Sequence, residues 1–252
     1  KAEQASQQQP APKVGIVTLS SQSYTLTSEL PGRTAAYRIA EVRPQVNGIL
    51  QKRLFKEGSD VKANQQLYQI DPALYEANLK SAQASLLASR SLAERYKVLV
   101  EERAVSRQQF DDAQATRLQA EAALERAKIE QRYTRVLAPI SGRIGRSTVS
   151  EGALVTNGQA QELAVIQQLD PIYVDVTQSA NDLLRLRREL ASGQLEKASE
   201  NAAQVTLKLQ DNSEYGHKGT LEFSEVSVDA GSGSVTLRAV FSNPDGLLLP
   251  GM

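Results

Sequence analysis

Residues 72–133 read PALYEANLKSAQASLLASRSLAERYKVLVEERAVSRQQFDDAQATRLQAEAALERAKIEQRY, with no glycine and no proline after Pro72. The first part of this stretch predicts a helix with one apolar seam, because alternating steps of four and three residues keep side chains on one face. We expect Asp71 to be the N-cap and Pro72 the first helical residue. The predicted seam residues, apolar or aromatic except for one serine, are Tyr75, Leu79, Ala82, Leu86, Ser89, Ala93, Tyr96 and Val100.

A second helix is predicted to begin after Ser106. Ser106 and Gln109 have the spacing of a capping box, and Val105 and Phe110 are placed to form a hydrophobic staple across it. The seam of this helix is interrupted by Arg117 and consists of Phe110, Ala113, Ala120, Leu124 and Ala127. Each of the two arms has roughly 28 residues and, at 1.5 Å per residue, reaches on the order of 40 Å. The stretch therefore predicts two helices folded back on each other, a hairpin too slender to enclose an active site.

The residues on either side of this hairpin repeat each other at a distance of 94 positions. VRPQVNG at 42–48 matches VLAPISG at 136–142, and EGSDV at 57–61 matches EGALV at 151–155. Short β-type runs with glycine turns in two copies indicate one supersecondary unit used twice. Each copy is too small to bury a core alone, so we expect the two copies to complete one small β-sandwich. The hairpin is then an insertion into a split β-domain.

Four glycines occupy equivalent places in this repeat. Gly48 and Gly142 close the first shared motif, and Gly58 and Gly152 lie in the second. We expect all four to be structural turn residues, because glycine adopts backbone angles that other residues avoid.

The chain after the repeat predicts further β-structure with one short helix. The helix is expected to be capped at Ser179, to carry Leu183, Leu186 and Leu190 inward and to end at Gly193. Alternating apolar residues predict strands that include Ile172, Val174, Val176, Val205, Leu207, Leu209, Val235, Leu237, Ala239 and Phe241. Several short strands with one helix favour a small closed barrel, since closure hides strand edges.

The split β-motif resembles the lipoyl/biotinyl carrier fold. The version with a coiled-coil hairpin between its halves is similar to the periplasmic adaptors, or membrane fusion proteins, of RND-type tripartite efflux pumps. The segments that carry this resemblance are ELPGRT (29–34), RIAEVRPQV (38–46), LYQIDP (67–72), PISGRIG (139–145), QLDPIYVDVTQ (168–178) and LLPGM (248–252). They match the AcrA/MexA branch of the family over nearly the whole chain.

The resemblance implies an elongated, multidomain α+β fold in which each domain is interrupted by the next. The predicted parts are a flexible leader at 1–13, a partial membrane-proximal β-domain with a strand at 14–21, a β-barrel domain from 22–38 and 168–252, a split lipoyl-like domain from 39–71 and 134–167, and an α-helical hairpin at 72–133.

The resemblance also implies a function. Adaptors of this branch are not enzymes; they join a proton-driven RND transporter of the inner membrane to a TolC/OprM-like channel of the outer membrane, and they assemble as hexameric homo-oligomers. They are held in the periplasm by a lipid on an N-terminal cysteine, which would lie outside this chain. An adaptor of an ABC-type or type I secretion exporter would share the hairpin and the split domain, so it is the alternative.

Arg95, Leu99 and Ser106 stand in the spacing Arg-x3-Leu-x6-Ser. This spacing is similar to the motif with which such adaptors engage the outer-membrane channel at the hairpin tip. An exposed leucine and a multi-donor arginine suit docking against helix ends, whose free carbonyls accept hydrogen bonds. The residues alone leave simpler explanations open: Ser106 is also an N-cap, Leu99 can pack in the turn, and Arg95 can be solvated.

Composition argues against other classes of function. Lysine and arginine total 29, as do aspartate and glutamate, so no net charge attracts the chain to nucleic acid. The chain has no cysteine, which excludes disulfides and thiolate chemistry, and no apolar run near the roughly 18 residues that a membrane span needs. Its single histidine, His217, lies in a predicted loop and does not suggest a triad base.

We expect no cofactor and no metal. A lipoyl or biotinyl carrier presents a lysine on a tight turn between its half-motifs, but here the hairpin replaces that turn. Lys80, Lys97 and Lys128 all lie on its predicted helices. Copper or silver relay needs soft ligands, and the chain contains one methionine, one histidine and no cysteine.

Overall fold

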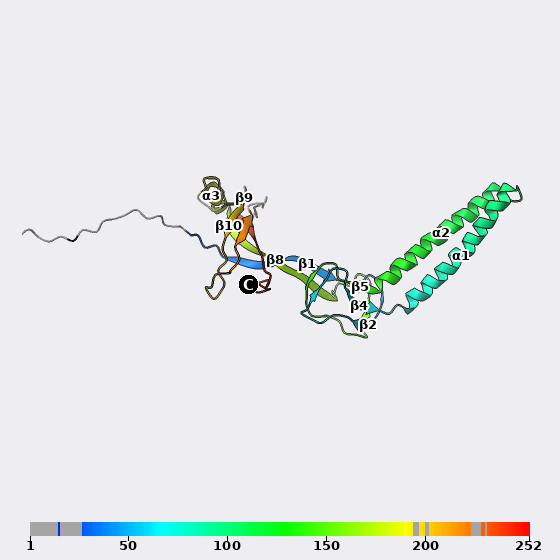
Figure 1. Cartoon of the computed structure of the whole chain (residues 1–252), viewed down its shortest axis with the longest axis horizontal. Coiled ribbons are helices and arrows are strands. Elements are labelled where there is room, and N and C mark those ends of the chain that lie inside the picture. Colours follow the sequence, from blue (N-terminus) through cyan, green and yellow to red (C-terminus); the bar gives the residue numbers. More distant parts are fainter. Residues whose placement is uncertain (1–14, 16–26, 194–196, 200–201, 223–227, 230) are drawn as a thin grey trace, which may run out of the picture. The chain divides into compact units, whose positions relative to one another are not determined.

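The computed structural model describes residues 15, 27–193, 197–199, 202–222, 228–229 and 231–252 (Figure 1). The chain divides into two units, Lys1–Leu30 and Pro31–Met252. The leader predicted at 1–13 lies outside the described residues, and so does the strand predicted at 14–21, apart from Gly15. All helices and strands named below belong to the second unit.

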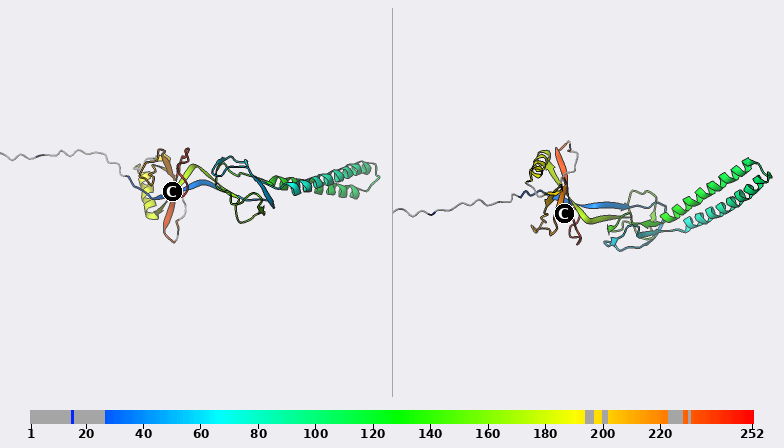
Figure 2. Two further views of the ribbon diagram at one scale, coloured as in Figure 1. Left: turned by 90° about the horizontal axis from the view of Figure 1, so that it is seen from below. Right: turned by 45° about the horizontal axis from the view of Figure 1, so that its top comes forward.

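The predicted hairpin consists of α1 (Ala73–Glu101) and α2 (Arg107–Tyr133). The two helices run beside each other in both views of Figure 2. Helix α1 begins one residue later than predicted, so Pro72 and not Asp71 occupies the N-cap position, where it makes no side-chain capping bond. Asp71 still contributes at this end, since its Oδ1 accepts a hydrogen bond of 3.0 Å from the N–H of Ala73.

Burial along the hairpin follows the predicted seams. Every predicted seam residue is buried or half-buried. The most buried ones are small, which lets the helices approach closely: Ser89, Ala93, Ala113 and Ala127. Arg117, which interrupts the second seam, is half-buried in it and forms an ion pair of 2.6 Å with Glu121, one turn further on.

The two half-motifs exchange strands. Strand β2 (Gly48–Arg53) pairs with β7 (Leu154–Val155), and β3 (Asp60–Val61) pairs with β6 (Gly142–Ile144). These two pairings are equivalent, since adding 94 to each paired residue of β2 or β3 gives its counterpart in β6 or β7. Strands β4 (Gln66–Ile70) and β5 (Arg135–Leu137) complete a sheet with the order β5-β4-β2-β7. Each half therefore depends on the other for its backbone partners.

Both halves also contribute to one apolar core. Its buried members come from residues before and after the hairpin and include Val42, Leu50, Val61, Leu67, Tyr68, Ile70, Val136, Ile144, Val155, Leu163 and Ile166. The structure thus confirms that two copies of one motif form a single β-sandwich with the hairpin inserted between them. Neither half alone could cover these side chains.

Two long strands connect this sandwich to the rest of the unit. Strand β1 (Gly32–Val42) pairs with β8 (Ala164–Ser179) along nearly its whole length. The first part of β8 also pairs with β6 of the sandwich, and the second part pairs with β12 (Ser234–Phe241). Strands β1 and β8 therefore form a two-stranded ribbon that belongs to both β-domains.

The second β-domain contains the strand order β8-β12-β11-β10-β9. Its remaining strands are β9 (Lys197–Ser199), β10 (Ala202–Val205) and β11 (Gly219–Glu222). Helix α3 (Ala180–Ala191) buries three leucines and is capped by Ser179, as predicted. Strand β1, which pairs with β8, also contacts the last described residue: the N–H of Thr34 donates to the carbonyl of Met252 at 2.9 Å. A pairing of β9 with β1, which would close the barrel, is not among those of the described residues.

One predicted strand is shorter in the structure. Strand β10 ends at Val205, although the alternation continues through Leu207 and Leu209. The chain turns back sharply after these residues, because the N–H of Leu209 donates to Ser213 and the carbonyl of Leu207 accepts from Tyr215. Within the described ranges, no helix combines the length and apolar character that crossing a membrane requires.

Candidate functional site

The tip of the hairpin is built by the end of α1 and the start of α2. The N–H of Ala104 donates to the carbonyl of Leu99 at 2.8 Å, and the N–H of Arg103 donates to Val100 at 3.1 Å. This pair of bonds is a Schellman motif, in which the residue after the C-cap is left-handed. Arg103 occupies that position, with φ of 59°.

Helix α2 begins with the capping box that the sequence predicts. Ser106 Oγ accepts a hydrogen bond from the N–H of Gln109 at 3.2 Å, and Gln109 Oε1 accepts from the N–H of Ser106 at 3.0 Å. Both bonds satisfy donors at the helix start that have no partner within the helix. The tip is therefore a short connection held at both ends by hydrogen bonds.

The predicted docking residues lie around this connection. Arg95 and Leu99 are four residues apart on α1, so they share one helix face. Arg95 and Ser106 are exposed, whereas Leu99 is half-buried. The partial burial of Leu99 agrees with packing in the turn, and it still leaves part of the side chain accessible.

Two arginines near the tip differ from three others on the hairpin. Arg90, Arg117 and Arg126 each form an ion pair with a glutamate four residues further on. In the part of the chain that the structure describes, Arg95 and Arg103 form no ion pair. Their guanidinium donors are available to a partner molecule, whereas those of the other three are engaged.

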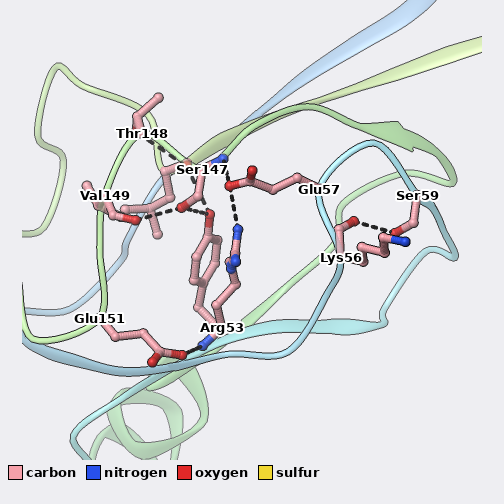
Figure 3. A network of polar contacts seen from close by, with 10 residues as sticks. Arg53, Lys56, Glu57, Ser59, Ser147, Thr148, Val149 and Glu151 are labelled. Carbon is pink, nitrogen blue, oxygen red and sulfur yellow. Dashed lines mark hydrogen bonds and ion pairs between the residues drawn. The ribbon is translucent and has the colours of Figure 1, made fainter.

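Two equivalent carboxylates join the halves of the split domain (Figure 3). Glu57 Oε1 accepts a hydrogen bond of 3.0 Å from the N–H of Ser147. Glu151 Oε1 accepts one of 2.7 Å from the N–H of Arg53. Residues 53 and 147 are themselves equivalent in the repeat, so the two contacts are the same interaction made in opposite directions. The Arg53 guanidinium adds an ion pair to Glu57.

Tyr68 extends this network into the core. Its ring is fully buried and packs edge-on against Phe55 at 5.2 Å between centroids. Its hydroxyl donates to the carbonyl of Leu163 at 2.9 Å and lies 2.8 Å from Ser147 Oγ, which in turn donates to Val149. Burial raises the pKa of the Tyr68 phenol above 10.0, and the hydrogen bond with Ser147 opposes that rise.

The four repeat glycines fall into two kinds. Gly58 and Gly152 have φ of 74° and 87°, where residues with a Cβ are strained, and no atom would contact an added Cβ. Gly48 and Gly142 are the first residues of β2 and β6. A Cβ at Gly142 would lie 2.4 Å from the carbonyl oxygen of Gln167, so the backbones approach too closely for any side chain.

A groove of about 710 Å³ lies where the hairpin joins the sandwich, lined in part by Asn47, Tyr75, Ile129 and Tyr133. The Tyr75 hydroxyl donates to the carbonyl of Asn47 at 2.7 Å across this junction. Over the described ranges, no three histidine, aspartate or glutamate side chains gather as metal ligands.

Sequence reasoning did not single out three of these residues. Arg103 is detectable only in hindsight: the tip connection has no glycine, so another residue must take the left-handed position. Glu57 and Glu151 were visible in the repeat itself, but spacing does not tell which backbone N–H a carboxylate reaches.

Two family models match the chain, one over the split domain with its hairpin and one over the second β-domain. Residues 38–167 match the family described as "RND MFP, barrel-sandwich hybrid domain", and residues 171–252 match "RND MFPs, beta-barrel domain". The chain belongs to the RND membrane fusion proteins.

Individual relatives are similar over all or nearly all of the chain. "Multidrug resistance protein MexA" of Pseudomonas aeruginosa is 70% identical over 241 residues, which are 96% of this chain and 63% of that protein. "Multidrug/solvent efflux pump periplasmic linker protein MepA" of Pseudomonas putida is 68% identical over all 252 residues and 66% of its own length. The chain thus spans about two thirds of the length of these relatives.

A solved structure supports the fold. A chimeric protein of MacA carrying the α-hairpin domain of Pseudomonas aeruginosa MexA superposes with a TM-score of 0.71 at 31% identity. The superposition covers 88% of this chain and 77% of the chimera.

Proposed function

We propose that this protein is a non-enzymatic periplasmic adaptor of a tripartite multidrug efflux pump. It connects an inner-membrane RND transporter to a TolC/OprM-like outer-membrane channel. Support comes from relatives named as efflux pump periplasmic linkers and from the RND family of both matched domains. The same RND match favours this proposal over an ABC-type or type I secretion exporter. The domain boundaries predicted from the sequence are part of the proposal.

Docking to the outer-membrane channel is supported by the geometry of the hairpin tip. Arg95, Leu99 and Ser106 surround a connection whose backbone is held by a Schellman motif and a capping box. A rigid end of this kind loses little conformational freedom when it binds, so more of the contact energy appears as affinity. We propose that these three residues contact the periplasmic end of the channel.

The remaining parts of the proposal concern assembly and anchoring. The adaptor works in the periplasm as a homo-oligomer, hexameric in the assembled pump, and is held at the inner membrane by an N-terminal lipid. One acyl chain gives only marginal membrane affinity, so contacts with the transporter contribute the rest. The channel opens only if the tips bind its open form more tightly than its closed form.

Cross-linking in intact cells tests the docking proposal. The 252-residue sequence has no cysteine, so a single cysteine replacing Leu99 in the full-length protein gives one defined site at the tip. A short thiol- and amine-reactive cross-linker is added, and adducts are identified by mass spectrometry. The matched control is a cysteine replacing Ser91, which is exposed on α1 away from the tip.

We expect an adduct with an outer-membrane channel from the Leu99 position and none from the Ser91 position. Adducts only between adaptor copies, or none while efflux stays normal, would contradict docking through the tip.

A further inference from the structure

Arg103 has an unusual backbone conformation for its residue type. Among the described residues, three that are not glycine have left-handed φ: Asn64 at 65°, Arg103 at 59° and Asn212 at 67°. Asparagine tolerates this region because its short polar side chain can form local hydrogen bonds. Arginine has no such compensation, and glycine is the usual residue after a helix C-cap. The tip therefore keeps arginine at a position where glycine would be more stable.

The surroundings of Arg103 offer nothing to offset that cost. Its side chain is exposed, and in the described part of the chain it forms no ion pair with its neighbours Glu101 and Glu102. The backbone on both sides is held, by the bond from Ala104 to Leu99 and by the capping box at Ser106. The guanidinium is thus carried on an ordered support at the tip, with its donors free.

We propose that Arg103 is a further docking residue, and that its guanidinium binds free backbone carbonyls at helix ends in the mouth of the channel. This inference rests on the proposed adaptor function. A residue that costs stability but remains in an ordered, exposed place is explained when it serves binding. The planar guanidinium has five donors, enough to reach two carbonyls at once.

Neutral carbonyls fit this tip better than acidic side chains do. Glu101 and Glu102 are both exposed beside Arg103, and the C-terminal end of α1 carries a negative partial charge. A rim of carboxylates on the partner would be repelled by these groups. Carbonyl oxygens accept from the guanidinium without adding a full negative charge.

The test separates stability from binding. Arg103→Gly in the full-length protein should slow amide hydrogen exchange at Ala104, because glycine relieves the backbone strain. The same variant should bind the outer-membrane channel captured through position 99, purified in lipid nanodiscs, about tenfold more weakly. Arg103→Lys keeps the charge but loses the planar fork, so its affinity for the channel should lie between those of the wild type and Arg103→Gly.

Asn212→Gly is the matched control, since it makes the same backbone change far from the tip in sequence and should leave channel binding unchanged.

Wild-type binding should also change little when salt is raised from about 50 mM to about 500 mM, because carbonyls are neutral. A steep loss with salt would overturn the assignment to carbonyls.

Two further results distinguish this inference from the proposed function. If Leu99→Asp abolishes channel binding while Arg103→Gly binds like wild type, Arg103 is only a turn residue and the inference is wrong. If no channel is captured through position 99, or Leu99→Asp binds normally, docking through the tip fails, and the role of Arg103 fails with it.

Discussion

Glu57 and Glu151 occupy the same place in the two halves of the repeat, and each carboxylate accepts a hydrogen bond from a backbone N–H of the other half. The bonds are 3.0 Å and 2.7 Å long and end on residues that are themselves equivalent, Ser147 and Arg53. A chain interrupted by a long hairpin must bring its half-motifs together again. These reciprocal contacts tie them together at two equivalent points.

Removing either carboxylate should weaken the split domain. We expect Glu57→Ala and Glu151→Ala each to lower the free energy of unfolding by about 1 kcal/mol, since each leaves a backbone N–H without its protein acceptor. Urea denaturation followed by circular dichroism measures this. Glu94→Ala is the control, because it breaks a fully exposed ion pair with Arg90 and should lower the free energy of unfolding less than either of the other two variants. Equal effects of all three variants would contradict a special role for the pair.

Alanine substitutions should rank the repeat glycines by mechanism. Gly142→Ala places a Cβ 2.4 Å from the Gln167 carbonyl oxygen, so it should cost about 3 kcal/mol or prevent folding of the sandwich. Gly58→Ala meets no atom and should cost only about 1 kcal/mol, through its left-handed φ of 74°. Gly58→Asn should cost less than Gly58→Ala, because asparagine tolerates that conformation. Thermal unfolding midpoints give the ranking, and the reverse order would contradict the cost assigned to the close approach at Gly142.

Tyr68 should make the sandwich sensitive to high pH. Burial raises the pKa of its phenol in the folded protein, whereas in the unfolded chain it ionises near 10. Above that pH the unfolded state loses its proton first, so stability is fully present below pH 10 and falls as pH rises toward the folded pKa. Urea unfolding between about pH 9 and 11.5 should show this fall.

Tyr68→Phe is the comparison for that experiment. At neutral pH it should cost about 1 kcal/mol, because the hydroxyl bond to Leu163 is lost. The stability of the variant should then depend less on pH than that of the wild type. Some dependence should remain, because the other tyrosines, such as Tyr215, still titrate in the variant. Identical pH profiles for the two proteins would exclude Tyr68 as a source of the effect.

Ser106 allows its two roles to be separated. Ser106→Ala removes the capping acceptor and should destabilise the start of α2 by about 1 kcal/mol, seen as faster hydrogen exchange at Gln109. Ser106→Asp keeps an acceptor and should restore that protection. If Ser106 also contacts the channel, cross-linking from position 99 stays low in both variants. Normal cross-linking with Ser106→Asp would mean that the serine acts only as a cap.

Much of the fold could be predicted because it depends on neighbours within a few residues. The seam from Tyr75 to Val100 follows from helical periodicity, and the capping box at Ser106 is closed by Gln109, three positions away. The repeat needs only comparison of the chain with itself. Strand β10 shows the limit of this approach, because the alternation through Leu209 continues past Val205, where the strand ends.

The amino-acid sequence by itself determined the hairpin, its caps and the duplication on either side of it, since these rest on local spacing and composition. Only the tertiary structure decided which backbone groups meet across the repeat. It alone revealed the bonds of Glu57 and Glu151 and the close approach at Gly142. The physical reason is that register and close approach arise from packing between segments distant in sequence, whereas periodicity and capping arise within one turn.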